Sequence, residues 1–212
     1  MSFSVQQRQA EGKTAALARL TLQHNLAPVQ VRQLLRNDLQ YAPFRMEGME
    51  QDVREMMEID TPQGKLALQI GGTIDRLDSK GDTLRIVDYK TGGTPKTPEN
   101  IEQLFTPADN RPNYIFQTFL YAAILCRKQS LKVAPSLLYI HRAASESYSP
   151  VIEMGAPRQP KVPVNNFAFF EDEFRERLHG LLQEIFSQEE TFSQTEDTRK
   201  CEYCDFRSLC KR

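Results

Sequence analysis

Apolar side chains near the start of the chain recur with the period of an α-helix. Residues 5–24 and 28–41 each gather leucine, valine or alanine on one side, and Pro28 suits the first turn of the second segment. The helical period then breaks over residues 42–51. The pattern therefore predicts two helices before residue 45.

From about residue 52 the apolar period shortens to two, which is the period of a β-strand. Residues 52–59, 65–78 and 83–90 form three such runs, and the turn sequence Ser-Lys-Gly-Asp separates the last two. A glycine pair, Gly71 and Gly72, interrupts the middle run and marks a bulge or a close backbone approach. The pattern predicts an antiparallel hairpin from the last two runs.

The second half of the chain alternates helical and extended segments. Residues 94–112 are rich in proline and polar side chains, which predicts a loop with one helical turn. Residues 113–129 predict a helix with Asn113 as its N-cap. The remaining predicted elements are a buried strand at 134–142, its hairpin partner at 149–154 and a long amphipathic helix at 170–188.

Composition limits the class of protein. The chain has 212 residues, 40% hydrophobic and 26% charged, which is ordinary for one large globular domain or one domain with a helical attachment. No apolar run approaches the roughly 20 residues that span a bilayer, and the N-terminus lacks a signal-peptide core, so we expect a cytosolic protein. The net charge of −1 argues against a globally basic nucleic-acid coat and leaves room for a local basic groove.

Three charged residues of the predicted hairpin point to metal chemistry. Asp75 lies on one arm, and Asp88 and Lys90 lie on the other. Two carboxylates from adjacent strands can share Mg²⁺ or Mn²⁺, and Lys90 lies on the same side of its strand as Asp88, with Tyr89 on the other. A metal lowers the pKa of bound water and a lysine can position that water, so the group suits phosphodiester hydrolysis. A surface hairpin with solvated charges is the alternative.

The sequence around this group resembles a known family. The segments GTIDRLD and IVDYKTG resemble the core of the RecB-like branch of the PD-(D/E)XK nuclease superfamily, and the thirteen positions from Asp75 to Asp88 are a family-like distance. The resemblance implies Asp75 as the first metal carboxylate, Asp88 and Lys90 as the D-x-K pair, and the Tyr89 carbonyl as a further metal ligand. It also implies an α/β fold, a restriction-endonuclease-like mixed central β-sheet flanked by helices, over residues 45–212, with residues 1–44 as an attached helical segment.

A second pair lies on the helix predicted at 113–129. Gln117 and Tyr121 are four residues apart and therefore share one helix face. Such a pair is commonly a half-exposed helix edge. It also resembles the Q-x-x-x-Y motif that follows the D-x-K strand in RecB-like nucleases, which implies that it orients the catalytic lysine and contacts DNA. Glycine pairs on both sides of the acidic group are expected to give a phosphate backbone close access.

Three of the four cysteines gather near the end of the chain. Cys201, Cys204 and Cys210 have the spacing C-x2-C-x5-C within a basic tail at residues 199–212. Three thiolates so spaced can bind zinc or one face of an iron–sulfur cluster. The tail resembles the C-terminal cysteine motif of AddB-type and CRISPR-associated RecB-like nucleases, where a distant N-terminal cysteine completes a 4Fe–4S cluster. This chain has no cysteine before Cys126, whose helical position favours packing over ligation.

Related nucleases usually carry an upstream helix with a His or Glu that completes the metal site. His24 is the one early histidine, and a helix end accounts for it without metal binding. His141 and His179 are expected to be structural or solvated. Because the missing cysteine and the missing histidine motif belong to the same end, we expect the chain to be the C-terminal part of a longer protein such as a helicase–nuclease. Degeneration of a whole enzyme is the alternative.

The acidic group predicts metal-dependent phosphodiester hydrolysis, and the resemblance implies an exonuclease-type, Mg²⁺- or Mn²⁺-dependent deoxyribonuclease in DNA repair or recombination. The same resemblance implies that its substrate is a DNA end or single strand delivered by a helicase region or subunit. A catalytically inactive nuclease-fold module that binds DNA or supports a partner is one alternative. A small interaction domain with a zinc-binding tail is another.

Overall fold

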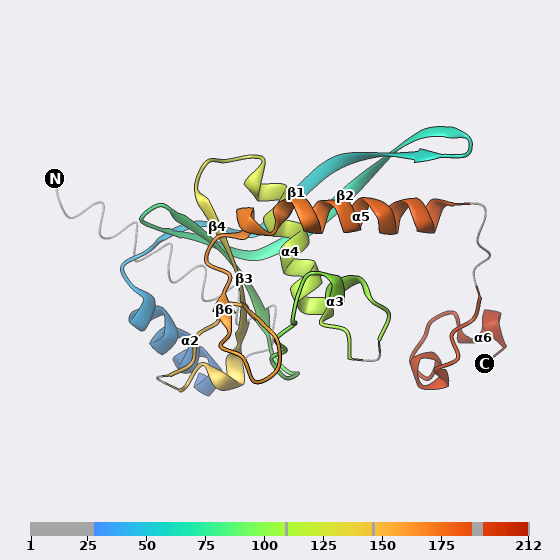
Figure 1. The fold of residues 1–212 in the computed structure, drawn as a ribbon. Helices are drawn as coiled ribbons and strands as arrows, with labels where there is room; N and C mark the ends of the chain where they lie inside the picture. The colour runs from blue at the N-terminus through green and yellow to red at the C-terminus, as the bar shows by residue number, and fades with distance from the viewer. Residues whose placement is uncertain (1–27, 109, 146, 188–192, 212) are drawn as a thin grey trace.

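A four-stranded mixed sheet forms the centre of the molecule (Figure 1). The structure, a computed structural model, describes residues 28–108, 110–145, 147–187 and 193–211. The strands are β1 (Arg45–Thr61), β2 (Gly64–Lys80), β3 (Thr83–Lys90) and β4 (Lys132–Tyr139), and they lie in this spatial order. The pairs β1–β2 and β2–β3 are antiparallel, whereas β4 runs parallel to β3. The α/β architecture with a mixed central sheet is confirmed.

Two hairpins build the antiparallel part of the sheet. The β2–β3 hairpin is the predicted one: β2 ends at Lys80, and β3 begins at Thr83. Gly81 in its turn has a φ of +61°, a conformation that glycine adopts without strain. The longer β1–β2 hairpin projects beyond the helices at the end where Thr61 pairs with Gly64 (Figure 1).

Three helices cover one face of the sheet. The helix α4 (Asn113–Cys126) connects β3 to β4 and packs its apolar residues on both, while α3 (Glu102–Phe105) and α5 (Glu171–Phe186) pack against α4. Parallel neighbouring strands require such a crossover connection. Phenylalanine rings from these helices and from η2 (Phe167–Phe169) join the layers, with neighbouring centroids 4.9–6.1 Å apart. These rings form the centre of the larger hydrophobic core.

The helix α2 (Pro28–Tyr41) covers the opposite face, where Leu34 packs with Val87, Tyr89 and Leu138. Side chains of a strand alternate between its faces. Leu84 and Ile86 belong to the core on the α4 side, whereas Val87 and Tyr89 belong to the core on the α2 side. The even-numbered residues at the end of β3, which include Asp88 and Lys90, therefore face the α4 side.

Several predicted boundaries and one predicted strand pairing are wrong. β1 begins at Arg45 rather than at residue 52. Asn113 is the first residue of α4 and not its N-cap; its side-chain oxygen accepts a hydrogen bond from Arg111 Nε at 2.8 Å instead. Residues 149–154 meet β4 only through an isolated antiparallel bridge between Ser136 and Val151, because β5 (Glu153–Met154) pairs with β6 (Val162–Pro163).

The predicted helices at 28–41, 113–129 and 170–188 are confirmed as α2, α4 and α5. The helix predicted at 5–24, together with His24, lies outside the described residues. Every helix in the described segments is too short or too polar to cross a lipid bilayer. The remaining short elements are η1 (Ile140–Arg142), η3 (Thr198–Cys201) and α6 (Arg207–Cys210).

Candidate active site

Asp75, Asp88 and Lys90 come together where the β2–β3 ladder ends. The last paired positions are Arg76 and Val87, so Asp75 and Asp88 are the next residues on the two strands. The Tyr89 N–H needs an acceptor at this point, and Asp75 Oδ2 accepts it at 2.8 Å. Lys90 Nζ lies 2.6 Å from Asp88 Oδ2. The three predicted residues thus form one group at the carboxyl end of β3.

The group is only partly open to solvent. The side chains of Asp88 and Lys90 are 6% and 15% exposed. An ion pair with so little solvent around it interacts more strongly than a surface pair, because water screens it less. The exposed ring of Tyr114, in the first turn of α4, lies 4.0 Å from Lys90 Nζ, measured to the ring centroid. Lys90 is therefore held between a carboxylate and an aromatic face.

Tyr89 turns its side chain to the other face of the sheet, as the strand period predicts. Its hydroxyl accepts a hydrogen bond from Arg76 Nη1 at 3.0 Å. Burial raises the pKa of Tyr89 to about 12, against the opposing charge of Arg76, so the hydroxyl is neutral at physiological pH. The backbone of Tyr89 thus contacts Asp75 on one side, while its ring is fixed behind the sheet.

A buried network of charges lies directly behind the candidate site. Arg76 donates to Asp38 of α2 at 2.9 Å and to Asp78 at 2.8 Å, and Arg85 donates to both carboxylate oxygens of Asp78 at 2.9 and 2.8 Å. Arg76, Asp78 and Arg85 are at most 4% exposed at their side chains. Burial raises the pKa of Asp38 although Arg76 opposes that shift. The network attaches α2 to the hairpin that carries the site.

Sequence reasoning missed this network. The sequence does contain a feature that indicates it, namely charged residues at alternating positions of two apolar strands. Arg76 and Asp78 lie on one face of β2, and Arg85 lies on the same face of β3. Charged residues in strands are usually taken as solvent-facing, because arginine and aspartate are rarely fully buried unless paired. Pairing them requires α2, whose position no local pattern predicts.

Gln117 and Tyr121 contact each other and the sheet. Gln117 Nε2 donates to the Tyr121 hydroxyl at 2.9 Å, and Tyr121 is 4% exposed. A Cβ at Gly72 would lie 2.4 Å from that hydroxyl, so the glycine is needed for the close approach of α4 to β2. Among the described contacts, those of Lys90 are with Asp88 and Tyr114 rather than with this pair. The proposed effect of Gln117 on the lysine stays a prediction.

The glycine pair in the middle of β2, Gly71 and Gly72, has a different role from the one expected. Gly71 has a φ of +142°, and a Cβ there would lie 2.0 Å from the Val53 carbonyl of β1. The space beside Gly72 is filled by Tyr121. The sequence left a bulge and a close backbone approach as the two interpretations of this pair. The close approach is confirmed, and the β1–β2 register around the pair has no bulge. The expectation that these glycines give access to a phosphate backbone is wrong for Gly71 and Gly72, because protein atoms occupy both places.

The oxygen donors of the site fit a hard divalent cation. Asp75 and Asp88 bring two carboxylates next to the Tyr89 backbone, and Asp75 uses only Oδ2 for the Tyr89 N–H. Mg²⁺ and Mn²⁺ prefer carboxylate, carbonyl and water oxygens. Asp88 already attracts one cation, the Lys90 ammonium. The chemistry of the donor set is therefore consistent with the metal that the sequence implies.

The three cysteines of the tail are separate free thiols in the described part of the chain. Within these segments no three His, Cys, Asp or Glu side chains gather as metal ligands, and this includes Cys201, Cys204 and Cys210. Burial raises the pKa of Cys126 to about 11, so its thiol is protonated at neutral pH, as a packing residue would be. His141 is exposed and His179 is half-buried on α5.

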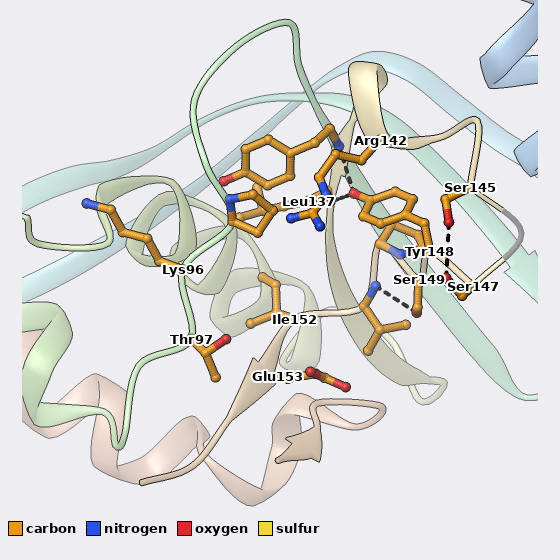
Figure 2. A pocket seen from close by; sticks show the side chains of 14 residues that line it. Lys96, Thr97, Leu137, Arg142, Ser145, Ser147, Tyr148, Ser149, Ile152 and Glu153 are labelled. Atoms are coloured by element: carbon orange, nitrogen blue, oxygen red, sulfur yellow. Dashed lines mark hydrogen bonds between the residues drawn. The ribbon is translucent and has the colours of Figure 1, made fainter. Parts of the chain in front are cut away.

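Two hollows lie at the carboxyl ends of the parallel strands, on either side of Tyr139. One, of about 290 Å³, is lined by Tyr114, Tyr139, Lys96 and Arg111 among others. The other, of about 300 Å³, lies between residues 95–97 and residues 145 and 147–153, and Figure 2 shows Arg142 beside Tyr148 at this place. The Tyr148 hydroxyl donates to the Leu137 carbonyl at 2.9 Å and accepts from Tyr139 N at 2.8 Å, which anchors the loop to β4.

Comparison with known proteins assigns the family. No curated protein matches the chain. A family model described as the PD-(D/E)XK nuclease superfamily matches residues 4–211, which is almost the whole chain. The matched region contains the mixed sheet and the acidic group with its lysine, in agreement with the resemblance seen in the sequence. The chain therefore belongs to the PD-(D/E)XK nuclease superfamily.

Proposed function

We propose that this protein is a metal-dependent deoxyribonuclease of the RecB-like branch, acting as an exonuclease. Family membership implies phosphodiester hydrolysis of the nuclease type. The observation that carries the proposal is the junction of Asp75, Asp88 and Lys90 at the end of the β2–β3 ladder, with a hydrogen bond of 2.8 Å and an ion pair of 2.6 Å holding it together. In this proposal Asp88 and Lys90 are the D-x-K pair, and Asp75 is the first metal carboxylate.

In this proposal Asp75, Asp88 and the Tyr89 carbonyl hold Mg²⁺ or Mn²⁺. When bound, such an ion supplies an acidified water and neutralises charge on the phosphate. Lys90 has three N–H donors. One donates to Asp88, and the others orient the attacking water and donate to a phosphate oxygen, where negative charge develops. The Tyr114 ring keeps the ammonium at this place.

The finer assignment rests on the sequence motifs. We propose that the chain is the nuclease part of a RecB/AddB-like helicase–nuclease in DNA repair or recombination, with Gln117 and Tyr121 as its Q-x-x-x-Y motif. Cys201, Cys204 and Cys210 would ligate a 4Fe–4S cluster or zinc together with a ligand from elsewhere. Metal analysis and the absorption spectrum of the purified protein test the tail: iron with a visible thiolate–iron band supports a cluster, and zinc without that band supports a zinc site.

Cleavage of a labelled oligonucleotide with Mn²⁺ or Mg²⁺ tests the enzymatic proposal. We expect cleavage by the parent, loss of cleavage on EDTA addition, and at least about a hundredfold slower cleavage by Asp88→Asn and Lys90→Gln. Asp82→Asn, in the β2–β3 turn, and Lys65→Gln, at the far end of the β1–β2 hairpin, are matched controls and should cleave like the parent.

The same experiment distinguishes an inactive DNA-binding module from an enzyme. If the parent does not cleave with either metal, and the parent, Asp88→Asn and Lys90→Gln bind DNA equally, the enzyme assignment is wrong. Calorimetric titration with Mn²⁺ adds an independent readout. The parent should bind Mn²⁺, and Asp88→Asn should bind it at least about tenfold more weakly, because the site loses one of its two carboxylates.

A further inference from the structure

The carboxyl ends of β3 and β4 place the two hollows beside the candidate active site. Lys90 is opposite Tyr139 in the parallel β3–β4 register. Tyr139 lines both hollows, and η1, which carries Arg142, follows it directly. In sheets with parallel strands, ligands bind at the carboxyl ends, where the loops leave the strands. A substrate strand that leaves Lys90 would therefore meet these two hollows next.

The first hollow combines aromatic surface with positive charge. Tyr114 is 46% exposed, and its ring also contacts the Lys90 ammonium. Tyr139 lines the same hollow. Lys96 and Arg111 supply the charge, and none of the described residues that line this hollow is acidic. Lys96 Nζ donates to the Asn110 and Arg111 carbonyls, which joins the two walls of the loop around the hollow. Its volume of about 290 Å³ suits a group of nucleotide size.

The second hollow is suited to a phosphate group. It shares Lys96 and Tyr139 with the first and adds Arg142 and the hydroxyls of Ser145 and Ser149 (Figure 2). Glu153 is the acidic residue among its described lining. Arg142 is the cation that faces this hollow, because Figure 2 shows the Lys96 side chain pointing away from Arg142, and Lys96 Nζ donates to the Asn110 and Arg111 carbonyls. Arginine and serine donors are common partners of phosphate oxygens. The order of chemical groups from Lys90 outward is thus an aromatic wall followed by a guanidinium and hydroxyls.

We propose that these two hollows form a binding track for single-stranded DNA next to the cleaved bond. The first hollow takes one nucleotide, with its base against Tyr114, and the second takes the following phosphate at Arg142. A base can stack on a side chain only when it is not stacked within a duplex, so the track selects single strands over duplexes. This inference rests on the proposed nuclease function and names its substrate class.

Binding measured without cleavage tests the track. The probes are a fluorescent oligo-dT and a blunt duplex of the same length, and the protein carries Asp88→Asn to prevent cleavage. Adding Tyr114→Leu should weaken oligo-dT binding about tenfold or more, because one base loses its stacking surface. Adding Arg142→Gln should weaken it and reduce the slope of log affinity against log salt by about one, because one phosphate contact is lost. Duplex binding should change less than twofold in both.

Two substitutions serve as matched controls. Phe169→Leu removes an aromatic ring that is 84% exposed on η2, and Lys65→Gln removes a charge at the distant hairpin end. Both should leave oligo-dT binding unchanged. Unfolding in urea verifies that each variant is folded. The proposal is overturned if Asp88→Asn does not bind oligo-dT, if Tyr114→Leu and Arg142→Gln bind it like their parent, or if they weaken duplex binding equally.

Failure of the track and failure of the nuclease assignment give different results. If the unaltered chain does not cleave with Mn²⁺, yet Tyr114→Leu and Arg142→Gln selectively lose oligo-dT binding, the track is supported and the enzyme assignment fails. If the unaltered chain cleaves and the two substitutions do not change oligo-dT binding, the enzyme assignment stands and the track is wrong.

Discussion

Replacing Arg76 by methionine tests whether the buried network supports the hairpin that carries the site. Arg76 donates to Asp38 and Asp78, contacts the Tyr89 hydroxyl at 3.0 Å, and its guanidinium lies 4.7 Å from the Phe44 ring centroid. Methionine has a similar length without charge or donors. The substitution therefore removes the link between α2 and the two strands while it keeps most of the buried volume.

The magnitude follows from which partners lose a cation. Removing one member of a buried ion pair costs about 3–5 kcal/mol, because the remaining charge stays buried. Asp78 is fully buried but keeps two hydrogen bonds from Arg85, whereas Asp38 is 21% exposed and loses Arg76. Asp38 regains some hydration, which places the expected loss at the low end, about 3 kcal/mol of the free energy of unfolding.

Urea unfolding followed by circular dichroism measures this loss. Arg177→Met is the matched control, because Arg177 pairs with Glu173 on the exposed surface of α5 and such pairs contribute about 0–1 kcal/mol. Arg76→Lys, which keeps the charge but loses the planar guanidinium, should fall between Arg76→Met and the parent. A loss below about 1 kcal/mol for Arg76→Met would refute the conclusion that this network stabilises the hairpin.

Three further predictions concern packing, thiol reactivity and the α5 attachment. Gly72→Ala should lower the free energy of unfolding by about 1–3 kcal/mol, since its Cβ would lie 2.4 Å from the Tyr121 hydroxyl. The double variant with Tyr121→Ala should lose less stability than the sum of the two single variants, and additive losses in urea unfolding would contradict the contact. Iodoacetamide at pH 8 should label exposed Cys204 well before Cys126, because the pKa of about 11 leaves on the order of one in a thousand Cys126 side chains as thiolate. Equal labelling rates by mass spectrometry would disprove this. Arg175→Lys should lower the free energy of unfolding by about 1.5–3 kcal/mol in the same urea assay, because it loses the paired hydrogen bonds at 2.9 Å to Glu55 of β1. An unchanged urea midpoint would show that this pair does not attach α5 to β1.

Local patterns predicted the elements of the site because its motifs lie within short segments. The period of two places Asp88 and Lys90 on the same face of β3, and the turn at residues 79–82 pairs that strand with β2. The period of 3.6 places Gln117 above Tyr121 on α4, where their side chains bond. Each of these relations depends only on residues close in sequence, so the sequence alone determines it.

Only the tertiary structure decided the contacts between distant segments. The end of the β2–β3 ladder joins Asp75 to the Tyr89 amide, and the packing of α4 brings Tyr114 rather than Gln117 onto Lys90. The burial of Arg76 requires α2, and the role of Gly72 requires Tyr121 from a helix more than forty residues away. A sequence period states which face a side chain occupies but not which partner covers that face. That partner is determined by how the helices pack on the sheet.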